Sequence, residues 1–135
     1  AVYTGLLDTC LGGLGHFGLG RIAAAQCSLE RADRELEQAR QMRPVDARIV
    51  NDLGMVRFAR RDYAGAAESF RTAVELTRGE GPAMRNLLHV LVVQQQWAQA
   101  EQVARRFSVN LAEIEALREA PVPDFGCAQA RAQVP

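Results

Sequence analysis

Residues 47–80 read ARIVNDLGMVRFARRDYAGAAESFRTAVELTRGE, and this stretch is the most informative part of the chain. Apolar residues recur at helical spacing in two runs, 47–60 and 63–76. Asp62 lies between the runs and can cap the second one, while Arg78-Gly79 follows its end. The stretch therefore predicts two helices joined by a short turn.

The same pattern recurs 34 residues before and 34 residues after this stretch. Small residues that permit close helix packing fall in the same columns, and so do large residues that fill the space between helices. The columns are Leu19, Leu53 and Leu87; Gly20, Gly54 and Leu88; Ala32, Ala66 and Ala100; Leu36, Phe70 and Ala104; Ala39, Ala73 and Phe107; Leu29, Tyr63 and Trp97. One such match would be noise, but this many in one register indicate an internal repeat.

We expect an all-α superhelix of about three helix pairs with a C-terminal capping helix. The predicted helices are 14–26 and 29–42, 47–60 and 63–76, 82–94 and 97–107, and a last helix near 109–120 that begins at Ser108 or Asn110. The repeats are 13–46, 47–80 and 81–107, the capping helix occupies 108–120, and the proline-containing tail 121–135 is expected to be loose or extended. Residues 1–12 form either an N-terminal helix or the end of an earlier repeat.

With this register, the chain resembles the tetratricopeptide-repeat family. Its L-G…A…F…A skeleton is present as Leu53-Gly54, Ala66, Phe70 and Ala73, although Arg78 stands where the family usually has proline. The resemblance implies a protein-binding module in which the first helix of each pair lines a concave surface. It implies no enzymatic activity, cofactor or metal.

By this resemblance, three first-helix segments supply a peptide-binding groove. The candidate groove residues are Phe17, Arg21, Arg48, Asn51, Met55, Phe58, Arg85, His89 and Val92. Apolar anchors beside arginines suit an amphipathic helix or an extended peptide. The alternative is that the tail or residues 1–12 cover part of this face.

The composition excludes several function classes. The 16 basic residues are all arginine and are balanced by 16 acidic residues, so overall charge does not favour nucleic acid or an anionic membrane. The absence of lysine rules out Schiff-base chemistry and Walker-type phosphate contacts. No catalytic constellation is present, and we expect neither an enzyme nor a protein with a small-molecule substrate.

Two features imitate other sites. Residues 13–18, GLGHFG, match a dinucleotide-binding fingerprint, but no strand pattern surrounds them, so we interpret them as part of a glycine-rich helix. His16 is expected to pack between helices, and His89 to face the groove, where it could hydrogen-bond to a partner. The carboxylates Asp33, Glu35, Glu37, Asp62 and Glu68 are interpreted as solvated outer faces.

The three cysteines, Cys10, Cys27 and Cys127, allow two interpretations. In the first, Cys27 is a small buried helix residue and the other two are loop or tail thiols. In the second, one disulfide forms, most simply with Cys10, and requires an oxidising compartment. Their spacing does not fit a structural zinc site.

A narrower resemblance lies in RNLLHVLVVQQQWAQAEQVARR at 85–106 and NLAEIEALREA at 110–120. These segments, and Asn51-Asp52-Leu53-Gly54, are similar to Tad-type (Flp) pilus assembly proteins. The family consists of outer-membrane lipoproteins that face the periplasm and act as pilotins for the secretin. Cys10 does not lie in a lipobox, so this resemblance implies a lipid anchor upstream of Ala1 as the membrane attachment.

We therefore expect a pilus or secretion-system assembly factor whose partner is a secretin subunit or another secretion component. The first alternative is a cytoplasmic repeat adaptor for another peptide or helix. The second is a regulatory repeat domain of a longer chain.

Overall fold

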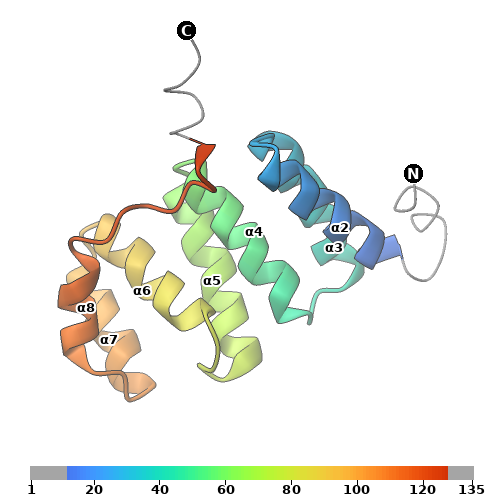
Figure 1. The fold of residues 1–135 in the computed structure, drawn as a ribbon. Coiled ribbons are helices and arrows are strands. Elements are labelled where there is room, and N and C mark those ends of the chain that lie inside the picture. The colour runs from blue at the N-terminus through green and yellow to red at the C-terminus, as the bar shows by residue number, and fades with distance from the viewer. Residues whose placement is uncertain (1–11, 128–135) are drawn as a thin grey trace, which may run out of the picture.

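The computed structural model describes residues 12–127, which form seven helices (Figure 1). They are α2 (Gly12–Ala25), α3 (Leu29–Met42), α4 (Ala47–Ala59), α5 (Tyr63–Thr77), α6 (Ala83–Val93), α7 (Trp97–Arg106) and α8 (Leu111–Leu117). The predicted bounds agree to within three residues. Residues 1–11, for which a helix or an earlier repeat was expected, lie outside the described part.

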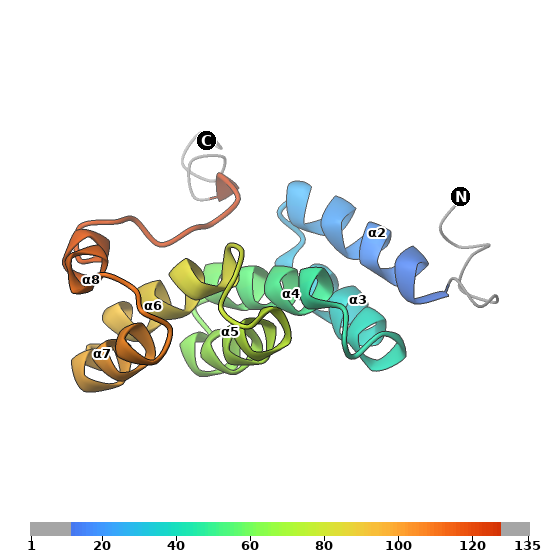
Figure 2. The same cartoon turned by 90° about the horizontal axis from the view of Figure 1, so that it is seen from below.

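The helices form two layers. Helices α2, α4 and α6 lie in one layer and their partners α3, α5 and α7 lie in the other, while α8 packs against the last pair (Figure 2). This all-α, superhelical arrangement is the predicted fold class. In the described residues no helix is both long and apolar enough to cross a bilayer.

Equivalent turns join the helices of each pair. Cys27, Arg61 and Gln95, spaced by 34 residues, have φ of 60°, 64° and 59° in the left-handed region. Asp62 then caps α5 by accepting a hydrogen bond from the Gly65 backbone N–H at 3.0 Å. The repeat is therefore preserved in backbone conformation as well as in sequence.

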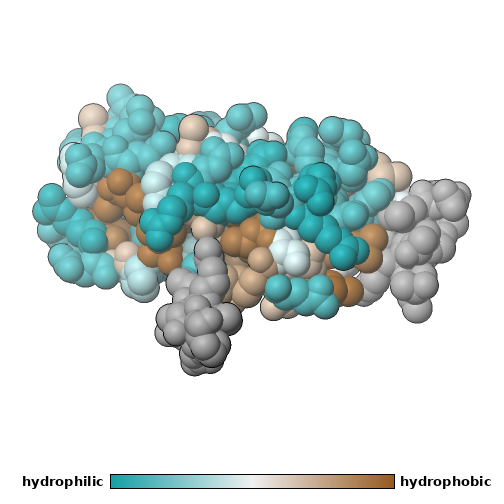
Figure 3. Space-filling model, turned by 90° about the horizontal axis from the view of Figure 1, so that it is seen from above, coloured by the Kyte–Doolittle hydropathy of each residue, from teal (hydrophilic) through white to brown (hydrophobic). Residues whose placement is uncertain are grey.

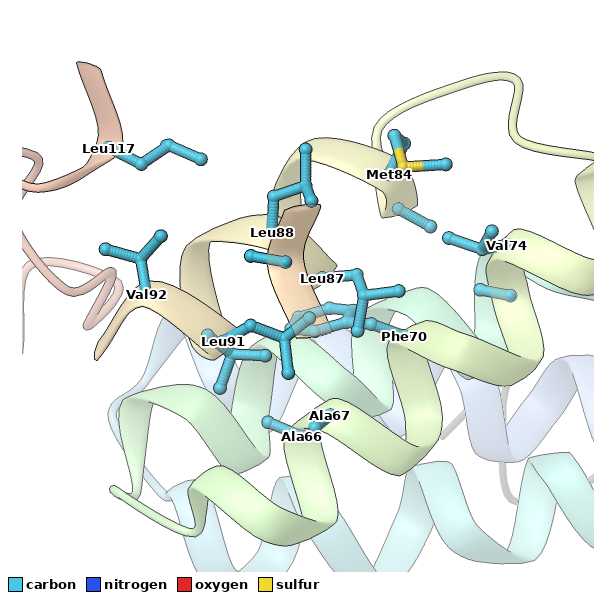
Figure 4. Close-up of a cluster of buried hydrophobic side chains, with 14 of the residues drawn as sticks. Ala66, Ala67, Phe70, Val74, Met84, Leu87, Leu88, Leu91, Val92 and Leu117 are labelled. Atoms are coloured by element: carbon cyan, nitrogen blue, oxygen red, sulfur yellow. The ribbon is translucent and has the colours of Figure 1, made fainter. Parts of the chain in front are cut away.

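Two apolar clusters hold the layers together. One contains Leu36 and Leu53 and joins α2, α3 and α4, and the other extends from α4 to α8. Figure 4 shows Phe70 of α5 beside Leu87 and Leu91 of α6, and these three side chains are at most 1% exposed. Burying each large apolar side chain contributes about 2 kcal/mol, so these columns account for much of the repeat's stability.

An ion-pair network also joins α3 to α4. Asp33 accepts from Arg60 at 2.8 Å and lies 3.4 Å from Arg57, and Arg57 also reaches Glu37 at 3.4 Å. The sequence interpretation of Asp33 and Glu37 as merely solvated carboxylates is therefore wrong.

After α8 the chain crosses the concave side of the molecule. Residues 120–127, which we call the strap, run over the α2–α4–α6 layer towards the end of α2 (Figures 1 and 2). The tail was expected to be loose or extended, and its first part is extended but held in place.

Candidate functional site

The nine candidate groove residues lie on α2, α4 and α6, the layer that the strap crosses. Four of them are buried: Phe17, Phe58, His89 and Val92 are 8%, 0%, 2% and 6% exposed. Arg21, Arg48 and Arg85 are exposed, and Asn51 and Met55 are half-buried. The structure therefore separates the predicted set into packing residues and accessible ones.

Phe58 belongs to the core. Its ring makes edge-to-face contacts with Tyr63, Phe70 and His89 at centroid distances of 5.8, 6.2 and 5.1 Å. Such aromatic contacts stabilise the fold in addition to the buried area. The expectation that Phe58 is a groove anchor, which could be truncated without unfolding the protein, is wrong.

His89 is occupied by the strap. Its Nε2 lies 3.3 Å from the Ala120 carbonyl oxygen, which accepts a hydrogen bond when Nε2 carries the proton. Burial lowers the pKa of His89, and the nearby Arg85 charge lowers it further, although the Ala120 hydrogen bond raises it. The expectation that His89 hydrogen-bonds to a partner is therefore corrected to a contact within the chain.

Two adjoining cavities remain open on the concave side, with volumes of about 310 and 530 Å³. Together we call them the concave hollow. Both cavities are lined by Arg21, Asn51, Asp52 and Pro82; Phe17 and Arg48 line the smaller one, and Met55 and Phe125 line the larger one. The hollow is large enough for a few side chains of a bound polypeptide.

Charged groups surround the apolar floor of the smaller cavity. The guanidinium carbons of Arg21 and Arg48 lie 5.5 and 5.6 Å from the centroid of the Phe17 ring. Arg21 Nε is 3.7 Å from Asp52 Oδ2, and Arg48 Nη2 is 2.9 Å from Asp46 Oδ2. Both arginines therefore present guanidinium groups at the rim, each with one carboxylate already nearby.

The Asp52 carboxyl is unusual among these groups. Partial burial raises its pKa, while the Arg21 charge lowers it to a smaller extent. Asn51 beside it accepts a hydrogen bond from the Asn86 side-chain amide at 3.0 Å. This pair links α4 to α6 across the floor of the hollow.

A disulfide between Cys27 and Cys127 fastens the strap, with Cα atoms 5.6 Å apart and 100 residues of sequence separation. The prediction of a buried helical Cys27 is wrong, because Cys27 is exposed in the turn after α2. A disulfide was one of the two interpretations, but the described pair does not include Cys10, which lies outside the described residues.

Sequence reasoning missed Phe125 as a lining residue. It belongs to the strap, is 42% exposed and faces the larger cavity. Its only sequence signal is its place two residues before Cys127, and that signal required knowledge of the disulfide pairing.

The remaining candidates are structural. Residues 13–18 lie within α2, which is the helical interpretation of the glycine motif. His16 Nδ1 lies 2.7 Å from a Glu35 carboxylate oxygen, which ties α2 to α3. Across residues 12–127 there is no cluster of three or more side chains suited to a metal ion.

The paired helices, their 34-residue register and the concave layer define a tetratricopeptide-repeat (TPR) protein. The chain is 36% identical over 116 residues to the TPR repeat-containing protein PA4299 of Pseudomonas aeruginosa. The match covers 86% of this chain and 47% of PA4299, so the chain spans about half the length of that relative. No family model matches the chain.

Proposed function

We propose that the chain is a protein-interaction scaffold that binds a segment of a partner polypeptide in the concave hollow. The observation that carries this proposal is an accessible cavity at Met55 and Phe125, beside the exposed guanidinium groups of Arg21 and Arg48. Apolar side chains supply binding energy, and guanidinium groups orient carbonyl or carboxylate oxygens.

The strap limits the form of the ligand. It crosses the concave layer and contacts His89, and Phe58 and Val92 are also buried. A long helix lying along α2, α4 and α6 would collide with residues 120–127. The accessible part of the face therefore favours a short extended segment over a long amphipathic helix.

For the particular partner, we propose the secretin of a Tad-type (Flp) pilus system, with this chain as an assembly factor of the pilotin kind. The support is the resemblance of residues 85–106 and 110–120 to that family. The Cys27–Cys127 disulfide favours an oxidising compartment such as the periplasm. A lipid anchor upstream of residue 1 and attachment to the outer membrane belong to the same proposal.

The test is binding of the purified, oxidised chain to the soluble part of the secretin subunit from the same organism. Met55→Ala is expected to weaken binding about fivefold to tenfold, because it removes an apolar contact in the hollow. Met42→Ala is the matched control, since Met42 is 47% exposed at the far end of α3. Its affinity should stay within about twofold of wild type.

Three results separate the proposals. Equal affinity of wild type and Met55→Ala would exclude the hollow as the site. No affinity for the secretin, together with a Met55-dependent interaction with a cytoplasmic protein, would favour an adaptor instead. A native chain carrying further domains would favour a regulatory module.

A further inference from the structure

A second hollow lies at the turn edge of the first two helix pairs. It has a volume of about 750 Å³ and is lined by residues 27–31, Arg34 and residues 59–61. Four of these residues are arginines, Arg31, Arg34, Arg60 and Arg61, and one is acidic, Glu30. We call it the arginine hollow.

The arginines of this hollow differ from most others in the protein. Nine of the fifteen arginines in residues 12–127 form an ion pair, and Arg60 is one of them through Asp33 at 2.8 Å. Arg31, Arg34 and Arg61 make no ion pair with any described carboxylate. Three of the six unpaired arginines are therefore gathered in one hollow of a chain with zero formal net charge.

The repeat brings these groups together. Arg31 and Arg34 are three residues apart on α3, so they share one face of the helix. Arg61 lies in the left-handed turn after α4, at the position equivalent to Cys27 in the neighbouring turn. A band of strongly hydrophilic residues also crosses the face of the molecule shown in Figure 3.

Guanidinium groups bind carboxylates through paired N–H···O bonds, and several of them around a cavity select a ligand with several carboxylates. We propose that the arginine hollow is a second interaction surface, and that it binds an acidic polypeptide segment. A protein segment can enter a hollow of this size, whereas the headgroup surface of a bilayer is flat. The hollow shares no lining residue with the concave hollow, so the two surfaces can act independently.

The test uses fluorescence anisotropy with a labelled peptide of about ten alternating glutamate and alanine residues. A peptide with glutamine in place of glutamate is the uncharged control. Wild type is expected to bind the glutamate peptide at least about tenfold more tightly than the glutamine peptide, with affinity falling as salt rises from about 50 to about 300 mM.

The double variant Arg31→Gln/Arg34→Gln removes two unpaired charges, and about tenfold weaker binding is expected. Its matched control is Arg71→Gln/Arg105→Gln, which removes two exposed charges on α5 and α7 and should change affinity less than twofold. Met55→Ala serves as a further control, because the concave hollow should be irrelevant to this peptide.

Three outcomes would overturn the proposal. The first is equal binding by wild type and Arg31→Gln/Arg34→Gln, and the second is an equal loss in both double variants, which would indicate a diffuse charge effect. The third is arginine-dependent binding to phosphatidylglycerol vesicles without binding to the glutamate peptide, which would assign the hollow to a membrane.

Discussion

Gly54 is the residue at which the packing of two helices is closest. A Cβ atom at this position would lie 2.5 Å from Phe70 Cε1 and 2.7 Å from Phe70 Cδ1. The Phe70 ring is fully buried, so it has no free space into which to move. The Gly54 and Phe70 columns of the repeat therefore depend on each other.

Gly54→Ala is expected to lower the free energy of unfolding by about 1–3 kcal/mol, in spite of the better helix propensity of alanine. Gly13→Ala is the control, because its nearest neighbours are Cγ and Cδ of the flexible Arg43 side chain. Chemical denaturation followed by circular dichroism measures both variants. Equal stability of wild type and Gly54→Ala would contradict the packing described for α4 and α5.

His89 gives the protein a pH-dependent stability. Because burial lowers the pKa of His89, the unfolded chain binds more protons than the folded chain near and below pH 6.5, the ordinary value for histidine. The contribution of neutral His89 is therefore present above this pH and is lost as the pH falls.

We expect the free energy of unfolding to fall by up to about 1 kcal/mol more in wild type than in His89→Gln between about pH 7.5 and about pH 5.5. Urea denaturation at the two pH values gives the difference, and the carboxylates common to both proteins cancel. Parallel pH profiles would show that His89 is not buried in the neutral form.

At the scale of elements, the strap has the fewest contacts of its own and depends on the Cys27–Cys127 disulfide. It contains no extended regular structure, and its printed attachments are the His89–Ala120 hydrogen bond, partial burial of Val122 and the disulfide. A cross-link between distant residues stabilises a fold by restricting the unfolded chain.

Cys27→Ser/Cys127→Ser is expected to lower the free energy of unfolding by about 2–4 kcal/mol. A thiol reductant should produce a similar loss in wild type and no loss in the double variant, which serves as its own control. Peptide mapping under non-reducing conditions should recover the linked peptides. A wild type whose stability is insensitive to reductant would contradict the fastened strap.

The helices could be predicted from the sequence, whereas the strap could not. Alanine, leucine and glycine columns at a fixed period report local helix packing, and one repeat helps to interpret the next. Cys127 has no counterpart in the repeat, and three cysteines permit several pairings. The contact between residues 27 and 127 depends on the curvature of the whole array, to which no local pattern refers.

At the scale of the whole molecule, the same distinction applies to the site. The repeat register correctly assigned the candidate residues to α2, α4 and α6, but register gives direction and not accessibility. Phe58 is buried by Tyr63 and Phe70, and His89 by the strap, because neighbouring elements close over them. Met55 stays within reach because the larger cavity opens beside it.

The most direct measurement is site-specific photo-crosslinking to the secretin subunit, with a photoreactive residue in place of Met55 in one sample and of Met42 in the other. A bound segment in the concave hollow should give a crosslink from position 55 to one short stretch of the secretin, and none from position 42. Crosslinks from position 42 without any from position 55 would contradict the concave hollow as the binding site.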